Sequence, residues 1–209
     1  DDNGNLLFLY EIYEGKGSNI YYQLNRYLSN GTDLKQVELT IPDKNINSLK
    51  IGFTLDEKII CAGFYGGRSA IIGTCFFIVE PQNNSVIYTQ LQEFSFDFQT
   101  IDISRRKKRK LQKKNKKRYL YNYQLDYLNI YNNNSISLVA EKRYTTEENN
   151  NSDPTSNDND TKTKYHNDNI IIIHLDSLGN IQNEKAIIKR QESSTFRRTY
   201  SNIVIRDTL

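Results

Sequence analysis

The most concentrated chemistry in this sequence is a run of cations. Eleven lysines and arginines, and no acidic residue, lie between Arg105 and Arg118. Without them, 17 basic residues stand against 25 acidic ones, so the rest of the chain carries a net charge of −8. Clustered cations release counterions from a polyanion, so the tract could bind phosphates, nucleic acid or acidic glycans. The candidate binding residues are Arg105, Arg106, Lys107, Lys108, Arg109, Lys110, Lys113 and Lys114.

The same tract also has a purely structural interpretation. It contains no Gly or Pro and suits a helix, although crowded like charges oppose one. We therefore expect a frayed, solvent-exposed helix or loop, a solvated insertion that balances an acidic body. Tyr119, Tyr121 and Tyr123 follow at alternate positions. They could stack on bases, but the same alternation indicates the return of the chain to a strand.

An Asn- and Asp-rich segment, 149–160, offers a second set of charged side chains. Asp153, Asp158 and Asp160 could supply oxygen ligands to Ca²⁺. The segment lacks the fixed Asp, Gly and Glu positions of a calcium loop, and its composition favours a disordered hairpin tip.

The histidines and cysteines form no recognisable catalytic or metal-binding pattern. His166 and His174 are the only histidines, and no acidic partner is placed beside them at the spacing of a triad. Cys61 and Cys75 lack ligand spacing, and residues directly opposite in a ladder make strained disulfides. We expect the cysteines to be small buried hydrophobic residues. The sequence therefore indicates no catalytic residue, no metal site and no cofactor.

The elements that must position these residues are short strands. The stretch 48–94 contains β-rich runs at 49–53, 59–65, 71–79 and 86–94, punctuated by Gly, Asn and Pro. This punctuation is typical of consecutive hairpins, so the fold class is expected to be all-β.

The four-strand pattern recurs on both sides of this stretch. Leu6 precedes the Asn30 turn by 24 positions, as Ile59 precedes the Asn83 turn. When two insertions are left out, a third copy has the same spacing between its strands and turns. Periods of this kind are typical of repeat arrays. The expected organisation is a unit lacking its first strand (1–47), a complete unit (48–98), a basic insert (99–122), a unit (123–192) with a polar hairpin insert (146–164), and the start of another unit (193–209).

The third strands of these units favour one architecture. The runs 76–79 and 170–173 are apolar without alternation, so both of their faces must be covered. Sheets that stack face to face around an axis, as propeller blades do, supply that cover. The sequence therefore predicts a partial propeller-like array of antiparallel four-stranded sheets.

The strand and turn chemistry also resembles a known family. The runs 59–65 and 75–79 with the following turn, and above all 172–181 with Gly179 and Asn180, resemble the bacterial β-propeller repeat of secreted proteins. The general pattern is also similar to uncharacterised propeller proteins of Bacteroidetes-like bacteria. The resemblance implies an extracellular, periplasmic or cell-surface location and an unknown function.

We expect a non-catalytic binding or scaffolding protein of unknown ligand, with a protein or glycan as a possible class of partner. One alternative is a propeller-fold hydrolase whose catalytic residues are not identifiable here, and another is polyanion binding through the basic insert. The longest apolar stretch, around 70–79, is too short to cross a bilayer as a helix, so no transmembrane segment is expected. Because the chain lacks Met and starts beside a strand pattern, we expect it to be part of a longer protein, and the family resemblance implies that this protein is exported.

Overall fold

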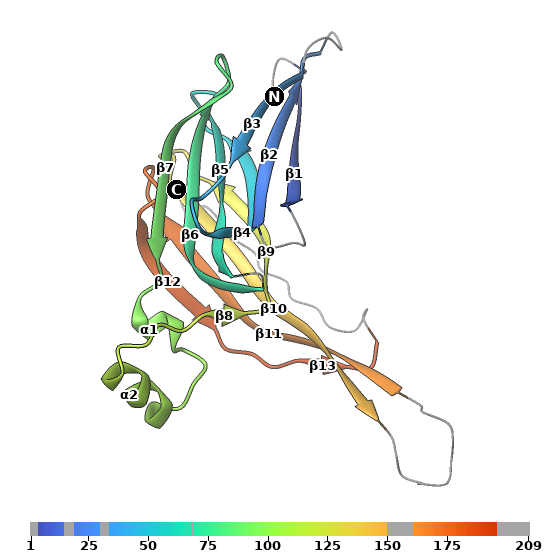
Figure 1. Cartoon of the computed structure of the whole chain (residues 1–209), viewed down its shortest axis with the longest axis vertical. Helices are drawn as coiled ribbons and strands as arrows, with labels where there is room; N and C mark the ends of the chain where they lie inside the picture. The colour runs from blue at the N-terminus through green and yellow to red at the C-terminus, as the bar shows by residue number, and fades with distance from the viewer. Residues whose placement is uncertain (1–3, 15–18, 30–33, 68, 150–160, 196–209) are drawn as a thin grey trace.

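The computed structural model describes residues 4–14, 19–29, 34–67, 69–149 and 161–195. This part of the chain is mostly β-strand arranged in antiparallel sheets, which confirms the all-β expectation (Figure 1). None of its helices has the length and apolar character needed to traverse a lipid bilayer.

The strands form three sheets, and apart from two short end strands described below, successive strands lie side by side in each sheet. The first sheet has the order β1 (Leu6–Glu14), β2 (Asn19–Tyr27), β3 (Leu34–Leu39). The second has the order β4 (Asn45–Phe53), β5 (Ile59–Gly67), β6 (Ala70–Glu80), β7 (Ser85–Glu93). The third has the order β9 (Tyr123–Ile130), β10 (Ile136–Asn149), β11 (Thr161–Leu175), β12 (Ile181–Ile187).

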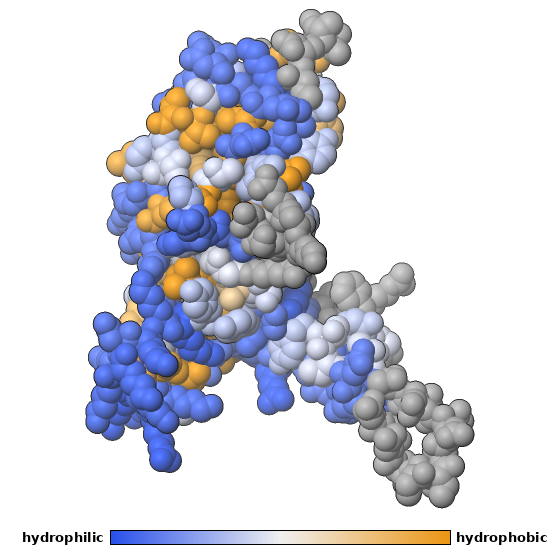
Figure 2. Space-filling view, in the orientation of Figure 1, coloured by the Kyte–Doolittle hydropathy of each residue, from blue (hydrophilic) through white to orange (hydrophobic). Residues whose placement is uncertain are grey.

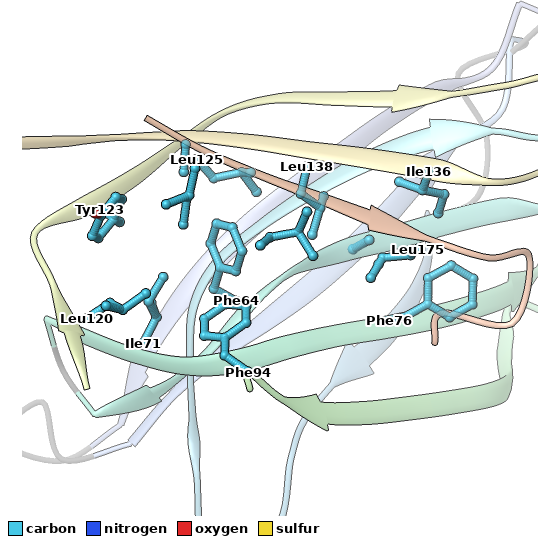
Figure 3. Packing of buried hydrophobic residues seen from close by; sticks show 14 of the residues in the cluster. Phe64, Ile71, Phe76, Phe94, Leu120, Tyr123, Leu125, Ile136, Leu138 and Leu175 are labelled. Carbon is cyan, nitrogen blue, oxygen red and sulfur yellow. The ribbon is translucent and has the colours of Figure 1, made fainter. Parts of the chain in front are cut away.

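The central strands of the second sheet, β5 and β6, are buried on both faces. Successive side chains of a strand point to opposite sides, so each of these strands contributes to two cores. Phe77 of β6 packs with β2 of the first sheet in one core cluster. Its neighbour Phe76 packs with Leu138 and Leu175 of the third sheet in the other cluster (Figure 3). The prediction that the apolar run 76–79 needs a sheet on each side is therefore confirmed.

The apolar run of β11 is covered less evenly. Ile171 and Ile173 are fully buried in the core against the second sheet. On the opposite face Ile170 is buried but Ile172 is only half-buried. Burial on both faces, predicted for this strand as well, is thus complete on one face and partial on the other.

The polar hairpin insert is more regular than its composition indicates. β10 and β11 stay paired out to Asn149 and Thr161, so both ends of the expected insert 146–164 are strand. Thr side chains suit a strand, and Lys164 makes an ion pair of 2.6 Å with Glu148 across the ladder. The expected tip, with Asp153, Asp158 and Asp160, lies outside the described residues.

The basic insert occupies a connection that has a counterpart in the third sheet. After β7 ends, β8 (Leu120–Tyr121) pairs with the start of β6 beyond the last partner of β7. In the same way β13 (Glu192–Ser193) pairs with β11 beyond the last partner of β12. The link from β12 to β13 is short, whereas the link from β7 to β8 contains α1 (Phe96–Gln99) and α2 (Arg105–Lys113). The insert is therefore an expanded version of one connection.

The two cysteines behave as the sequence indicates. Cys61 pairs with Phe77 and Cys75 pairs with Gly63, so the two are not opposite one another in the ladder. Both are free, buried thiols. Burial raises the pKa of each thiol far above its ordinary value, so both stay protonated and uncharged in the core.

Candidate polyanion-binding site

The basic tract forms a helix outside the sheet stack. α2 projects from one end of the sheets together with α1, and the surface over it is almost entirely hydrophilic (Figures 1 and 2). Lys, Arg, Leu and Gln are good helix formers, and the cations Lys110 and Lys113 in the last turn complement the negative end of the helix dipole. Lys108 makes an ion pair of 2.8 Å with Asp97 of α1. Of the two conformations that the sequence left open, helix or loop, the segment Arg105–Lys113 therefore adopts the helix.

The end of α2 reverses the chain. Asn115 adopts a positive φ of 47°, a conformation that Asn tolerates better than most residues. The Asn115 N–H donates to the Gln112 carbonyl and the Lys116 N–H donates to the Leu111 carbonyl, each at 3.1 Å. This is the hydrogen-bond pattern of a Schellman motif. It directs residues 116–121 back past the helix, so the second half of the tract faces the first.

Arg118 anchors this returning segment. Its N–H donates to Gln99 Oε1 and its guanidinium to the Gln99 carbonyl, both at 3.1 Å. The guanidinium also forms a two-pronged contact with the Asp102 carboxylate, 3.3 Å in one prong. Gln99 is itself buried and donates to the Phe94 carbonyl at 2.9 Å. The return segment is therefore tied to the end of α1 and to the core.

The electrostatics of Asp102 agree with this anchoring role. Burial tends to raise the pKa of its carboxyl group, but the hydrogen bond and the charge of Arg118 lower it, as does the charge of Lys142. The net pKa lies below the ordinary value, so Asp102 is ionised at neutral pH. It thereby neutralises Arg118, whose side chain is held at the junction with the sheets.

An open cleft of about 560 Å³ lies between α2 and the return segment. On the helix side it is lined by residues 107, 110, 111 and 114, the i, i+3, i+4, i+7 spacing that places side chains on one helix face. Ile103 also lines it. The six cations that line this basic cleft are Lys107, Lys110, Lys114, Lys116, Lys117 and Arg118.

The cations of the basic cleft differ in whether their charge is compensated. Lys117 makes an ion pair of 2.6 Å with Glu93, and Arg118 is paired with Asp102. Among the residues that the structure describes, no carboxylate forms an ion pair with the other four lysines. Like charges that converge without counter-charges create a positive potential that attracts anions. The four lysines are Lys107, Lys110, Lys114 and Lys116.

Two tyrosines complete the basic cleft. Tyr119 and Tyr121 retain 38% and 51% exposure, whereas Leu120 between them is 1% exposed. The alternation is that of a strand with one face on the core. It breaks at Asn122, which has a positive φ of 64°, and the next tyrosine, Tyr123, is buried. The predicted row of three alternate tyrosines therefore gives two exposed rings in the cleft and one ring in the core.

The structure divides the candidate residues of the tract into two groups. Lys107, Lys110 and Lys114 line the basic cleft. The cations Arg105, Arg106, Lys108, Arg109 and Lys113 do not line it. Sequence reasoning did not single out the cations of the return segment as site residues; the Asn115 in the middle of the tract was the signal that the helix ends there. These missed residues are Lys116, Lys117 and Arg118.

A second pocket of about 410 Å³ lies among β1, β2, β4 and β9. Its charged residues are Lys50 and Asp126, and the latter pairs with Arg143 at 2.8 Å. This pocket therefore contains a single carboxylate, which is already in an ion pair.

The histidines hydrogen-bond locally. His174 Nδ1 lies 3.1 Å from Ser137 Oγ, and His166 Nε2 lies 2.7 Å from Thr146 Oγ1. The His166 ring also stacks on Tyr144, with centroids 4.5 Å apart. Within the described ranges, no group of three or more His, Cys, Asp or Glu residues is arranged to hold a metal ion.

Comparisons of the chain with protein-family models, with curated proteins and with solved structures found no match.

Proposed function

We propose that this chain is a non-catalytic binding module that captures a polyanion in the basic cleft. The observation that carries the proposal is the convergence of four lysines on one concave surface, two turns of helix on one side and the return segment on the other. None of the four has a carboxylate partner within the described part of the chain. A polyanion would neutralise charges that otherwise repel one another, and it would release its own counterions on binding.

The position of the lysines favours a binding surface over a solvated face. On a solvated helix the cations can point away from one another into water. Here the Schellman motif at Asn115 directs Lys116 toward the lysines of α2, which increases their repulsion. A ligand with several negative charges compensates that cost.

For the scaffold we propose a propeller-like array. Two observations support it: the middle sheet packs against a sheet on each side, and the second and third sheets repeat the same strand switch at β8 and β13. The resemblance to repeats of secreted bacterial proteins supports an exported location as part of the same proposal.

A propeller-fold hydrolase is the alternative within the same scaffold. Glycan hydrolysis ordinarily needs two carboxyl groups that flank the scissile bond. The pocket among β1, β2, β4 and β9 offers only Asp126, which is paired with Arg143. The geometry of the basic cleft supports binding better.

The test is retention on immobilised heparin, with the salt concentration at elution as the readout. The cleft variant replaces four lysines by glutamine, and the matched control removes four charges from the remaining faces of the same helix. The cleft variant is Lys107→Gln, Lys110→Gln, Lys114→Gln and Lys116→Gln, and the control is Arg105→Gln, Arg106→Gln, Arg109→Gln and Lys113→Gln.

We expect the cleft variant to elute at much lower salt than the parent protein and the control to elute close to the parent. Equal shifts for the two variants would mean that total charge, and not the cleft, decides retention. That result, or an unchanged elution of the cleft variant, would refute the proposed function.

A further inference from the structure

We infer, building on the polyanion-binding function proposed above, that the ligand of the basic cleft is a single-stranded nucleic acid whose bases stack on Tyr119 and Tyr121. Cations alone would serve any polyanion. The two exposed aromatic rings in the same cleft add a feature that favours a ligand with flat, accessible rings, since bases stack on aromatic side chains.

The two rings are held on one side of a fixed stretch of chain. Leu120 between them is buried and pairs with Ile71 of β6, while Tyr121 pairs with Ala70. Arg118, which directly precedes Tyr119, is hydrogen-bonded to Gln99 and Asp102. Rings placed on an anchored segment lose little conformational freedom when a ligand binds, which favours stacking.

The spacing of the rings favours a single strand over a duplex. Residues two apart on an extended chain are roughly 6.6 Å apart. This is about twice the 3.4 Å rise per nucleotide of one strand in B-DNA. Neighbouring bases can each meet one ring only if the strand stretches and its bases unstack. A single strand does so at small cost, whereas a duplex must first break base pairs.

The lysines are placed to track the backbone of such a strand. Lys107, Lys110 and Lys114 form a row along one face of α2, opposite the segment that carries the tyrosines. A positive groove beside stacking rings is the arrangement by which proteins bind single strands without sequence preference. With four phosphate contacts, the logarithm of the binding constant should fall with the logarithm of salt with a slope of about −2.8.

A sulfated glycan offers the cleft the same charges but no planar bases. Its sulfates would engage the lysines, and its puckered sugar rings offer C–H groups and not planar π-faces to the tyrosines. Loss of the two tyrosine rings should therefore weaken a sulfated-glycan complex far less than a complex with a base-bearing strand, which separates the two ligand classes by experiment.

The first test uses the unaltered protein and fluorescence anisotropy with a labelled oligothymidylate of about 12 nucleotides, within the site sizes of such proteins. The competitors are an abasic oligonucleotide of the same length, a duplex of the same length, and inorganic polyphosphate. We expect the abasic strand, which has the same phosphates, to bind at least roughly fivefold more weakly, because stacking is worth about 5- to 140-fold per base. Equal binding of the abasic strand would overturn the inference.

The second test uses variants. Tyr119→Leu with Tyr121→Leu should weaken oligothymidylate binding at least roughly fivefold and leave elution from heparin unchanged. Tyr119→Phe with Tyr121→Phe keeps both rings and should bind like the parent. The control is Tyr127→Leu, another half-exposed tyrosine, which lies on β9 outside the basic cleft.

The outcomes separate this inference from the proposed function. If the leucine variant binds oligothymidylate as well as the parent does, base stacking is wrong while polyanion capture stands. If the leucine variant loses oligothymidylate and heparin binding together, the rings maintain the cleft and do not read bases, which also overturns the inference. A parent protein that prefers heparin over oligothymidylate at equal charge would assign the cleft to a glycan.

Discussion

Removing the guanidinium of Arg118 is expected to destabilise the protein far more than removing its neighbour. The Arg118 and Asp102 side chains retain only 24% and 18% exposure, and their two-pronged contact is supported by the Gln99 carbonyl. Hydrogen bonds to charged groups contribute about 1.5–3 kcal/mol when they are shielded from water. We expect Arg118→Ala to lower the free energy of unfolding by about 2–3 kcal/mol.

Lys117→Ala is the matched control for this change. Lys117 and Glu93 are 62% and 36% exposed, and exposed ion pairs contribute about 0–1 kcal/mol. Urea unfolding of the two variants, followed by circular dichroism, measures both free energies. A double-mutant cycle with Asp102→Ala should give a coupling energy within the 0.5–3 kcal/mol range of contacting residues. If Arg118→Ala costs no more than Lys117→Ala, the anchoring role assigned to Arg118 is refuted.

The same pair predicts a dependence on pH. The pKa of Asp102 is lower in the folded protein than in the unfolded chain, where it is about 3.9. As pH falls, the unfolded chain therefore binds the proton first. The stabilisation by the Asp102–Arg118 pair is present above the unfolded pKa and is lost as pH falls through the folded pKa. The difference in stability between the parent and Arg118→Ala should shrink as pH is lowered from 6 toward the acid range. A difference that stays constant would contradict the coupling.

Three further outcomes are expected. Gly179→Ala should destabilise by more than about 2 kcal/mol, measured by urea unfolding, because φ is +77° and a Cβ would lie 2.5 Å from the Phe76 ring. Glu141→Ala should cost about 3–5 kcal/mol in the same assay, because this carboxylate is 1% exposed and its removal leaves two partly buried cations without it. Cys61 and Cys75 should react with a thiol reagent only after unfolding, since both are buried and protonated; rapid labelling of the native protein would contradict their burial.

The strands were the most predictable part of this molecule. Runs such as 59–65 and 71–79 are rich in β-branched and aromatic residues and end at Gly, Asn or Pro, and these local signals agree with the sheet that forms. The extension of β10 to Asn149 escaped prediction because its residues are polar. Their strand conformation depends on cross-strand partners, such as Lys164 for Glu148, which a single segment does not reveal.

The basic cleft was only half predictable, for a related reason. Composition identified the cations and left a helix or a loop open, but it could not show that the tract folds back on itself. That reversal depends on one residue with positive φ, Asn115, and on the distant hydrogen bonds of Arg118 to Gln99. Which lysines converge, and which point away, follows from this tertiary arrangement and not from the charge of any single position.

The connection between β7 and β8 has a consequence for how such a protein can change. It carries two helices and a cleft, while the corresponding link between β12 and β13 joins the same kind of strands with a few residues. The sheets therefore tolerate very different lengths at this junction. A new recognition element can be gained, exchanged or discarded there by insertion and deletion, and the hydrophobic layers that hold the molecule together need not be rebuilt each time.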